Sequence, residues 1–409
     1  MKNKSFEINP IPIISSKLFS EIASYSAFIS FISFIYLTTK DPFYSGGFLC
    51  FRILGIFFGC IFISKIYLIT QSKNLFFLID FVRGIIVLSL LFIENDQSKV
   101  FVLIFLGFFL GLGSSLYNIA MNVKIPELFE SEKVIGINTW FIFVASIGVI
   151  IGSLCSGALL AFFDYKFVFL LISFIYFSSA ISILFLSDRA PYKINQKIEN
   201  TQQTYKEFFI KTKNAINKSP LWGILLLITL LDTFGSSAHN IGKPIFANII
   251  SPDSAGRMLG FMIAFWAVGK FIGASSVRRF SKYMNQQNLL SFSFFVGVFI
   301  MSTFFILAFW QFNLILILIF SLFAGLGDGA SEVSTITLAQ KESSEIRMTL
   351  LSAIMLLQTI GFTIGIAMCV PLLHFLQVKY VVTLFHAFPI LAIIFFSLKY
   401  YLKIPQKIS

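Results

Sequence analysis

Long apolar segments recur along the whole chain, and no other feature constrains its fold as strongly. One of them, VFVLIFLGFFLGLGSSLYNIA at 100–120, carries no charged residue. About 20 helical residues cross a hydrocarbon core of ~30 Å, so a segment of this length can span a membrane. Since 57% of the residues are hydrophobic and only 12% are charged, a water-soluble fold is excluded.

The spans are predicted to be α-helices. In lipid every backbone polar group must be satisfied internally, and the strands of a barrel would be shorter and would alternate polar with apolar residues. Turn residues, charges and apolar length therefore predict an all-α membrane protein with twelve transmembrane helices. The predicted spans are 14–37, 44–68, 74–93, 99–123, 133–161, 166–187, 220–243, 254–280, 287–309, 313–339, 347–373 and 378–402.

One long polar segment, DRAPYKINQKIENTQQTYKEFFIKTKNAINKS at 188–219, separates the sixth span from the seventh. We therefore expect an N-terminal six-helix bundle at 1–187, a cytoplasmic central loop, and a C-terminal six-helix bundle at 220–409.

Lys and Arg are distributed unequally between the two sides of the membrane. With a cytoplasmic N-terminus, 22 of the 31, including Lys17, fall on the cytoplasmic side, 6, including Lys99 and Lys243, fall on the outer side, and 3 lie within spans. Positive residues favour the cytoplasmic side, so both termini are expected in the cytoplasm and the chain in the cytoplasmic membrane. No cleavage site follows the first apolar run, so the first helix is expected to remain. Because the basic residues lie in short loops, the net charge of +12 does not indicate nucleic-acid binding.

The two halves of the chain repeat each other, since four groups of residues recur at offsets of 211 to 214 and link corresponding spans. The matched groups are Gly55 and Gly59 with Gly269 and Gly273, Gly111 with Gly325, Gly148 and Gly152 with Gly361 and Gly365, and Glu21 with Asp232. A parallel duplication of six helices implies a pseudo-two-fold axis along the membrane normal, with a cavity between the halves at mid-depth. This geometry predicts a solute transporter that works by alternating access.

Charges inside the spans are the candidates for function, because a charge at mid-bilayer costs at least about 2.5 kcal/mol. Asp232 lies about eleven residues into the seventh span, ~17 Å deep and near the midplane. Ser236, His239 and Lys243 follow on the same helix face. We predict that Asp232 and His239 exchange protons; a structural ion pair is the alternative for Asp232.

Asp328 and Glu332 lie one helical turn apart in the tenth span. Two ionised carboxylates at this spacing repel, so the pair is expected to hold one proton or to face a cation. Lys270 of the eighth span and Arg52 of the second are the candidate cations. The pattern predicts binding of a proton or of substrate.

Two further charged sites have structural alternatives. Arg83 of the third span could offer positive charge to an acidic ligand, or it could be neutralised by Asp80, three residues before it. Glu21 matches Asp232 in the repeat, and this favours a position facing the cavity over one that reaches toward the interface.

Twelve spans in two parallel halves, a long central loop and internal termini resemble the major facilitator superfamily over essentially the whole chain. The family's motif after the second helix has a Gly, an Asp-Arg pair and further basic residues. In the second half, GASSVRRFSK keeps Gly273, Arg278 and Arg279, with Val277 at the Asp position. The resemblance implies a gating role for Gly273 and Arg278 without the salt bridge that the Asp supports.

The fifth span is similar to the glycine-rich motif of the family's drug/proton antiporters. Its GVIIGSLCSG has Gly148, Gly152 and Gly157 in place, with Ser153 where the family has Pro. FLIDFVRG in the third span is similar to the macrolide and siderophore efflux branch. The small residues are expected to let the fifth helix approach a partner in the other half, at a gate; ordinary close packing is the alternative.

The leading prediction is a secondary transporter, a proton antiporter that exports an amphipathic or anionic drug-like or siderophore-like molecule. The sequence has no ATP-binding motif, catalytic motif or Cys/His metal spacing, so an ion or solute gradient is expected to drive transport. No enzymatic activity, cofactor or metal is expected. The expected partners are a small-molecule substrate, protons and the lipid bilayer, and we expect a monomer. A proton symporter for a nutrient or siderophore is the first alternative, and a non-transporting membrane receptor is the second.

Overall fold

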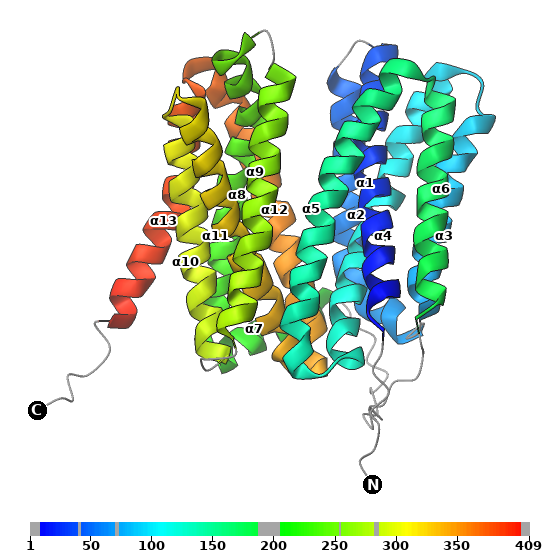
Figure 1. Ribbon diagram of the computed structural model, residues 1–409. Coiled ribbons are helices and arrows are strands. Elements are labelled where there is room, and N and C mark those ends of the chain that lie inside the picture. The colour runs from blue at the N-terminus through cyan, green and yellow to red at the C-terminus, as the bar shows by residue number, and fades with distance from the viewer. Residues whose placement is uncertain are drawn as a thin grey trace, which may run out of the picture. The chain divides into compact units, whose positions relative to one another are not determined.

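The computed structural model describes residues 9–39, 42–69, 73–186, 205–252, 255–281 and 286–401. These residues form thirteen α-helices and one short 3-10 helix, and no strand occurs among them (Figure 1). The helices are α1 (Ile11–Thr39), α2 (Pro42–Ile69), α3 (Lys73–Ser89), η1 (Leu90–Phe92), α4 (Asp96–Leu128), α5 (Ser131–Phe162), α6 (Tyr165–Leu184), α7 (Tyr205–Lys218), α8 (Pro220–Ile250), α9 (Ala255–Phe280), α10 (Gln286–Phe309), α11 (Leu314–Lys341), α12 (Ser344–Phe375) and α13 (Val378–Tyr401). Most of the predicted central loop, 188–204, lies outside the described residues.

Twelve helices of the described chain are long and apolar enough to cross a membrane, which confirms the predicted all-α fold with twelve spans. The thirteenth, α7, lies within the segment that was predicted to be a polar loop. Its sequence YKEFFIKTKNAINK contains neither Gly nor Pro, so nothing in it prevents a helix. Charge and polarity distinguish this segment from the apolar spans, but they do not distinguish a loop from a short polar helix.

The chain divides into two compact units. The first contains residues 1–211 together with 340–352, and the second contains 212–339 together with 353–409. The segment at 340–352 thus groups with the first unit although it joins α11 to α12. Within this unit, the Gln340 side chain accepts a hydrogen bond of 2.6 Å from Asn138 and donates one of 2.8 Å to the carbonyl of Asn122.

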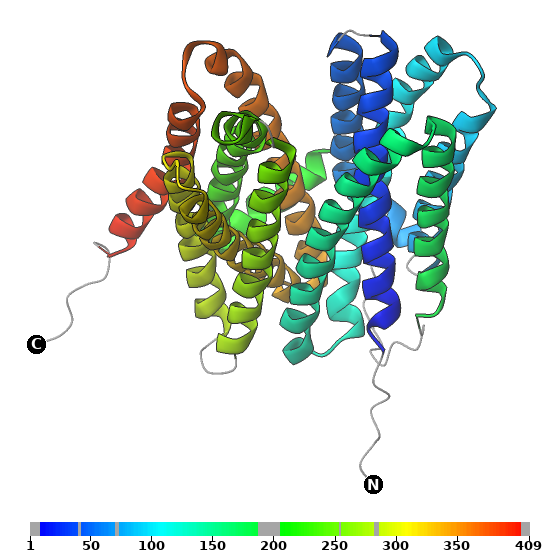
Figure 2. The same cartoon turned by 45° about the horizontal axis from the view of Figure 1, so that its top comes forward.

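In the first unit, α1 packs against both α5 and α6, while α2 packs against α4 and α3 against α6. The dark blue α1 lies beside the green α5 in both views (Figures 1 and 2). In the second unit, α13 packs against α8 and α10. The sixth helix of each half therefore contacts the first and third helices of that half, as a duplicated fold requires.

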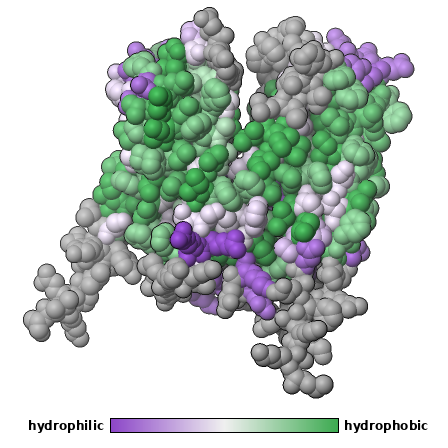
Figure 3. Space-filling model, viewed as in Figure 1, coloured by the Kyte–Doolittle hydropathy of each residue, from purple (hydrophilic) through white to green (hydrophobic). Residues whose placement is uncertain are grey.

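Large apolar side chains point outward along the helices. Phe105 is 58% exposed, Phe174 66% and Leu391 63%. Figure 3 shows hydrophobic residues over the middle of the visible face and hydrophilic residues toward the ends of the helices. Contiguous exposed apolar surface of this kind is typical of contact with lipid.

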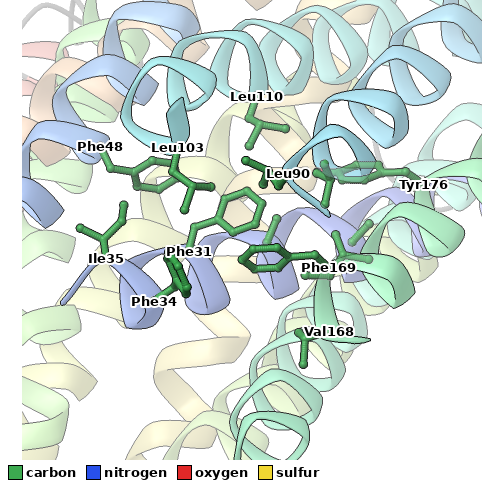
Figure 4. Packing of buried hydrophobic residues seen from close by; sticks show 14 of the residues in the cluster. Phe31, Phe34, Ile35, Phe48, Leu90, Leu103, Leu110, Val168, Phe169 and Tyr176 are labelled. Carbon is green, nitrogen blue, oxygen red and sulfur yellow. The ribbon is translucent and has the colours of Figure 1, made fainter. Parts of the chain in front are cut away.

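The core of the first unit is aromatic. The Phe31 ring of α1 meets Phe169 of α6 edge to face at a centroid distance of 5.1 Å, and Phe48 of α2 at 6.1 Å (Figure 4). All three rings are almost fully buried. Edge-to-face pairs favour a defined packing of the three helices, since the positive edge of one ring faces the negative face of another.

Glycines bring pairs of helices into backbone contact. A Cβ atom at Gly55 of α2 would lie 1.9 Å from the carbonyl oxygen of Phe108 in α4. In the second unit, a Cβ at Gly269 of α9 would lie 1.9 Å from the carbonyl oxygen of Leu322 in α11. These positions tolerate no side chain, so the repeated glycines mark the same helix pair, second with fourth, in each half.

The glycines of the fifth helix pack against the first helix of the same unit. A Cβ at Gly148 would lie 2.6 Å from the Cβ of Glu21, and one at Gly152 would lie 2.8 Å from the carbonyl oxygen of Ile22. Close packing of α5 on α1 therefore accounts for these two glycines within the first unit, and their role at a gate stays a prediction. Sequence periodicity shows that one face of a helix carries small residues, but it does not show which helix packs against that face. Gly157 lies in α5 beyond the described side chains.

The two remaining motif residues lie in α9. A Cβ at Gly273 would meet the carbonyl oxygen of Leu326 in α11 at 1.9 Å, so this glycine is a packing residue of the second unit. Val277, which occupies the Asp position of the family motif, is buried. Arg278 is exposed in the last turn of the helix, where a cation interacts favourably with the helix dipole.

Candidate substrate and proton site

The second unit contains a cluster of charges inside the membrane-spanning region. Lys270 of α9 lies between two carboxylates of α11, with its Nζ 3.2 Å from Oδ2 of Asp328 and 2.6 Å from Oε2 of Glu332. The two acids are four residues apart, so they lie on one face of α11 and reach the same cation. The structure thus brings together three residues that the sequence singled out, and Lys270 is the cationic partner of the pair.

Trp266, one turn before Lys270 on α9, completes this arrangement. Its indole Nε1 donates a hydrogen bond of 3.0 Å to Oδ2 of Asp328, the same oxygen that Lys270 approaches. The Lys270 ammonium also lies 4.9 Å from the centroid of the Trp266 ring. Asp328 therefore has two partners, the Trp266 indole and the Lys270 ammonium. Glu332 makes one ion pair, and its side chain is 32% exposed.

Asp232 of α8 belongs to the same electrostatic environment, because Asp328, Lys270 and Glu332 are the charges that act on it. Its Oδ1 is buried and has no hydrogen-bond partner among the described residues. A buried carboxylate oxygen without a donor costs free energy unless it is protonated or meets a ligand. Asp232 is thus the member of the cluster with a carboxylate oxygen that no described residue satisfies.

His239, one of the predicted proton-exchanging residues, lies further along α8 and pairs with a second histidine, His386 of α13. Its Nδ1 is 3.0 Å from Nε2 of His386 in α13, and Nδ1 of His386 is 3.1 Å from the hydroxyl of Ser302 in α10. Asn240 Nδ2 lies 3.2 Å from the other ring nitrogen of His239. The two imidazoles therefore form the centre of a buried hydrogen-bonded chain that connects three helices.

Such a chain can pass a proton only by changing tautomers, since each imidazole presents one donor and one acceptor when neutral. His386 had no visible partner in the sequence because it lies 147 residues from His239. No local signal could have paired the two.

Lys243 of α8 was assigned to the outer side by the distribution of positive charge, but it is buried, with only 5% exposed. Its ammonium lies over two aromatic rings, 5.3 Å from the centroid of Trp266 and 4.8 Å from that of Phe305. Counting charges along a sequence cannot separate a residue in the last turns of a buried helix from one in an adjacent loop.

In the first unit, Asp80 and Arg83 of α3 neutralise each other. Oδ1 of Asp80 accepts a hydrogen bond of 2.8 Å from Arg83 and one from Ser20, and Oδ2 accepts one of 2.6 Å from Ser179. Arg83 also donates to the Ser24 hydroxyl at 2.5 Å, and both charged side chains are almost fully buried. This environment favours the structural alternative for Arg83 over contact with an acidic ligand, because its charge is already balanced.

Glu21 of α1 also has a protein partner. Lys17, one turn earlier, donates a hydrogen bond of 2.5 Å to Glu21 and another to the side-chain oxygen of Asn118 in α4. The sequence had placed Lys17 on the cytoplasmic side as a charge outside the membrane. Arg52, the other candidate cation, lies in α2 of the first unit with its guanidinium 4.6 Å from the centroid of Phe28.

Chemically, the cluster in the second unit can bind and release protons or ionic groups. Asp328 and Glu332 share Lys270, and all three charges act electrostatically on Asp232, so the protonation of the three acids and the position of Lys270 are coupled. Among the described residues, no group of three or more His, Cys, Asp or Glu side chains could hold a metal ion. The arrangement is therefore one of titratable and aromatic side chains.

Comparison with known proteins agrees with this architecture. A family model described as Major Facilitator Superfamily matches residues 18–366. No curated protein matches the chain. Among solved structures, the E. coli fucose:proton symporter FucP is 16% identical with a TM-score of 0.63, and a bacterial homologue of the iron transporter ferroportin is 15% identical with a TM-score of 0.67. Each comparison covers 94% of this chain and 98% of the other, and at these identities each shows the shared fold alone.

Proposed function

Because this chain belongs to the Major Facilitator Superfamily and is a transporter rather than an enzyme, we propose that its second unit couples solute movement to protons through Asp232, Lys270, Asp328 and Glu332. The single observation that carries this proposal is the buried Oδ1 of Asp232, which has no hydrogen-bond partner among the described residues and is under the electrostatic influence of Lys270, a cation already paired with two other acids. A carboxyl group in that position is neutral when protonated and requires a counter-charge when it is not.

In the proposed cycle, deprotonation of Asp232 places a third negative charge next to Lys270. The Lys270 ammonium can then form an ion pair with Asp232. The acid that loses Lys270, Asp328 or Glu332, takes up a proton or releases a bound group. Protonation of Asp232 restores the observed arrangement. Since the acids come from α8 and α11 and the cation from α9, each exchange alters the attraction between these helices, which is how a charge change can favour one conformation over another.

We propose export of an amphipathic or anionic metabolite, drug-like or siderophore-like, across the cytoplasmic membrane, with both termini inside and the protein acting as a monomer. The sequence resemblance to the efflux branch supports this direction. Uptake by proton symport is the alternative, and one of the structural neighbours is described as a proton symporter. Accumulation of the solute in intact cells that express the protein, instead of its depletion, would establish uptake.

The coupling proposal is tested with Asp232→Asn, which keeps the shape of the side chain but cannot titrate. The solute is first identified by comparing the metabolites retained by a deletion strain with those in its medium. In everted vesicles, the variant is expected to lose solute-dependent proton movement, to the level of vesicles without the protein, while its amount in the membrane is unchanged. Asp96→Asn is the matched control, since the Asp96 side chain is 61% exposed at the start of α4. Wild-type proton movement in Asp232→Asn would remove this residue from the mechanism.

A further inference from the structure

The two lysines whose ammonium groups lie over Trp266, Lys243 and Lys270, differ in how they are neutralised. The Lys270 ammonium has two carboxylates within 3.2 Å, and one of them also accepts the Trp266 indole N–H. The Lys243 ammonium forms no ion pair or hydrogen bond with any described residue, and its contacts are the faces of Trp266 and Phe305. Lys270 is thus paired with two carboxylates, whereas Lys243 has only aromatic rings in close contact with its ammonium.

Burial makes this difference significant. Lys243 is 5% exposed, so water cannot provide the missing counter-charge in full. Asp328 is near enough to act on Lys243 electrostatically, but its Oδ2 already serves Lys270 and Trp266. Lys379 offers an informative comparison, because its ammonium also lies over two rings, Trp310 and Tyr380, at 4.8 and 5.1 Å. Lys379 is only partly buried, however, so water can complete its solvation.

From these contacts we propose that Lys243 binds the carboxylate of the transported solute, while Trp266 and Phe305 contact the apolar or aromatic body next to it. A single free cation matches one negative charge, so the substrate class is an organic monocarboxylate. This inference rests on the proposed transport function and identifies the part of the solute that the second unit recognises. Trp266 would also link substrate binding to the proton-coupling residues. A shift of its ring on binding would alter the hydrogen bond that its indole N–H donates to Asp328.

The test measures binding with defined probes on the purified full-length protein in detergent. Ligand-dependent unfolding temperature is recorded for benzoate, for its neutral analogue benzamide and for chloride, since a ligand that binds the folded state raises this temperature. Benzoate is expected to stabilise the wild-type protein, and the other two are not. Lys243→Met is expected to weaken benzoate binding at least tenfold. Lys243→Arg keeps the charge and should retain most of the binding.

Lys379→Met is the matched control, because it removes a lysine with the same two-ring contacts outside the cluster. It is expected to bind benzoate like the wild type. Equal stabilisation by benzamide or chloride, no stabilisation of the wild type by benzoate, or unchanged binding in a folded Lys243→Met would each overturn the proposal. Since the measurement needs no proton gradient, benzoate binding that persists without coupled flux would refute the coupling mechanism and leave the carboxylate site standing.

Discussion

Charged residues within the described membrane-spanning helices differ in the number of partners that the fold provides for them. Arg83 is held by one carboxylate and two hydroxyls, and Lys270 by two carboxylates. Lys243 has aromatic faces only, and Asp232 keeps one oxygen without a donor. Charges that are neutralised within the protein stabilise it, whereas the two that lack partners are available to ions and ligands.

At this scale, Asp80→Asn is expected to destabilise the protein strongly, because it leaves Arg83 buried without an anion. Removing one partner of a buried pair costs about 3 kcal/mol or more. The unfolding temperature of the purified protein in detergent measures the effect. Glu94→Gln is the control, since Glu94 is exposed, and its substitution should change the free energy of unfolding by less than about 0.5 kcal/mol. Equal losses in the two variants would contradict a structural role for Asp80.

The helices are positioned by small residues more than by matching apolar faces. In both units the second and fourth helices of the half come into backbone contact through glycines, and so do the first and fifth. Lipid is as apolar as the side chains, so close approach and interhelical hydrogen bonds drive association in place of the hydrophobic effect. The contact of α9 with α11 is also the one that brings Lys270 to its two acids.

Gly269→Ala is expected to force α9 and α11 apart, because its Cβ would lie 1.9 Å from the carbonyl oxygen of Leu322. Overpacking of this kind costs about 1 to 3 kcal/mol. Gly260→Ala in the same helix is the matched control, since a Cβ there meets nothing within 4 Å and alanine is the better helix former, by up to about 1 kcal/mol. Unfolding temperatures should therefore fall for the first variant and hold or rise for the second. The same change in both would exclude tight packing at Gly269.

At the scale of the whole molecule, we expect twelve spans to leave both termini on the same side of the membrane, and the distribution of Lys and Arg predicts that this side is the cytoplasm. The structure adds that some of the counted lysines, Lys17, Lys99 and Lys243, are buried in helices and paired or packed there. These three do not contribute as free loop charges. Removing them takes one from the cytoplasmic side and two from the outer side, so the asymmetry is strengthened.

Reporter fusions test this orientation. Alkaline phosphatase, which is active only outside the cytoplasm, is expected to be active when fused after Asn313, between α10 and α11, and inactive when fused after Ser343, between α11 and α12. Green fluorescent protein at the C-terminus is expected to fluoresce, as it does in the cytoplasm. The reverse pattern would place both termini outside and invert the direction assigned to the proton gradient.

The sequence alone determined the class of fold, because apolar segments of this length leave helices as the only way to satisfy the backbone in lipid. It also determined the internal repeat and four members of the charged cluster, Asp232, Lys270, Asp328 and Glu332, since charges are too costly in the membrane to occur there without a role or a partner. Only the tertiary structure decided the pairings. His239 with His386, Lys17 with Asn118 and α5 with α1 each join residues from different helices. Periodicity shows which face of a helix is polar or small, but the face that it meets comes from elsewhere in the chain and is set by packing.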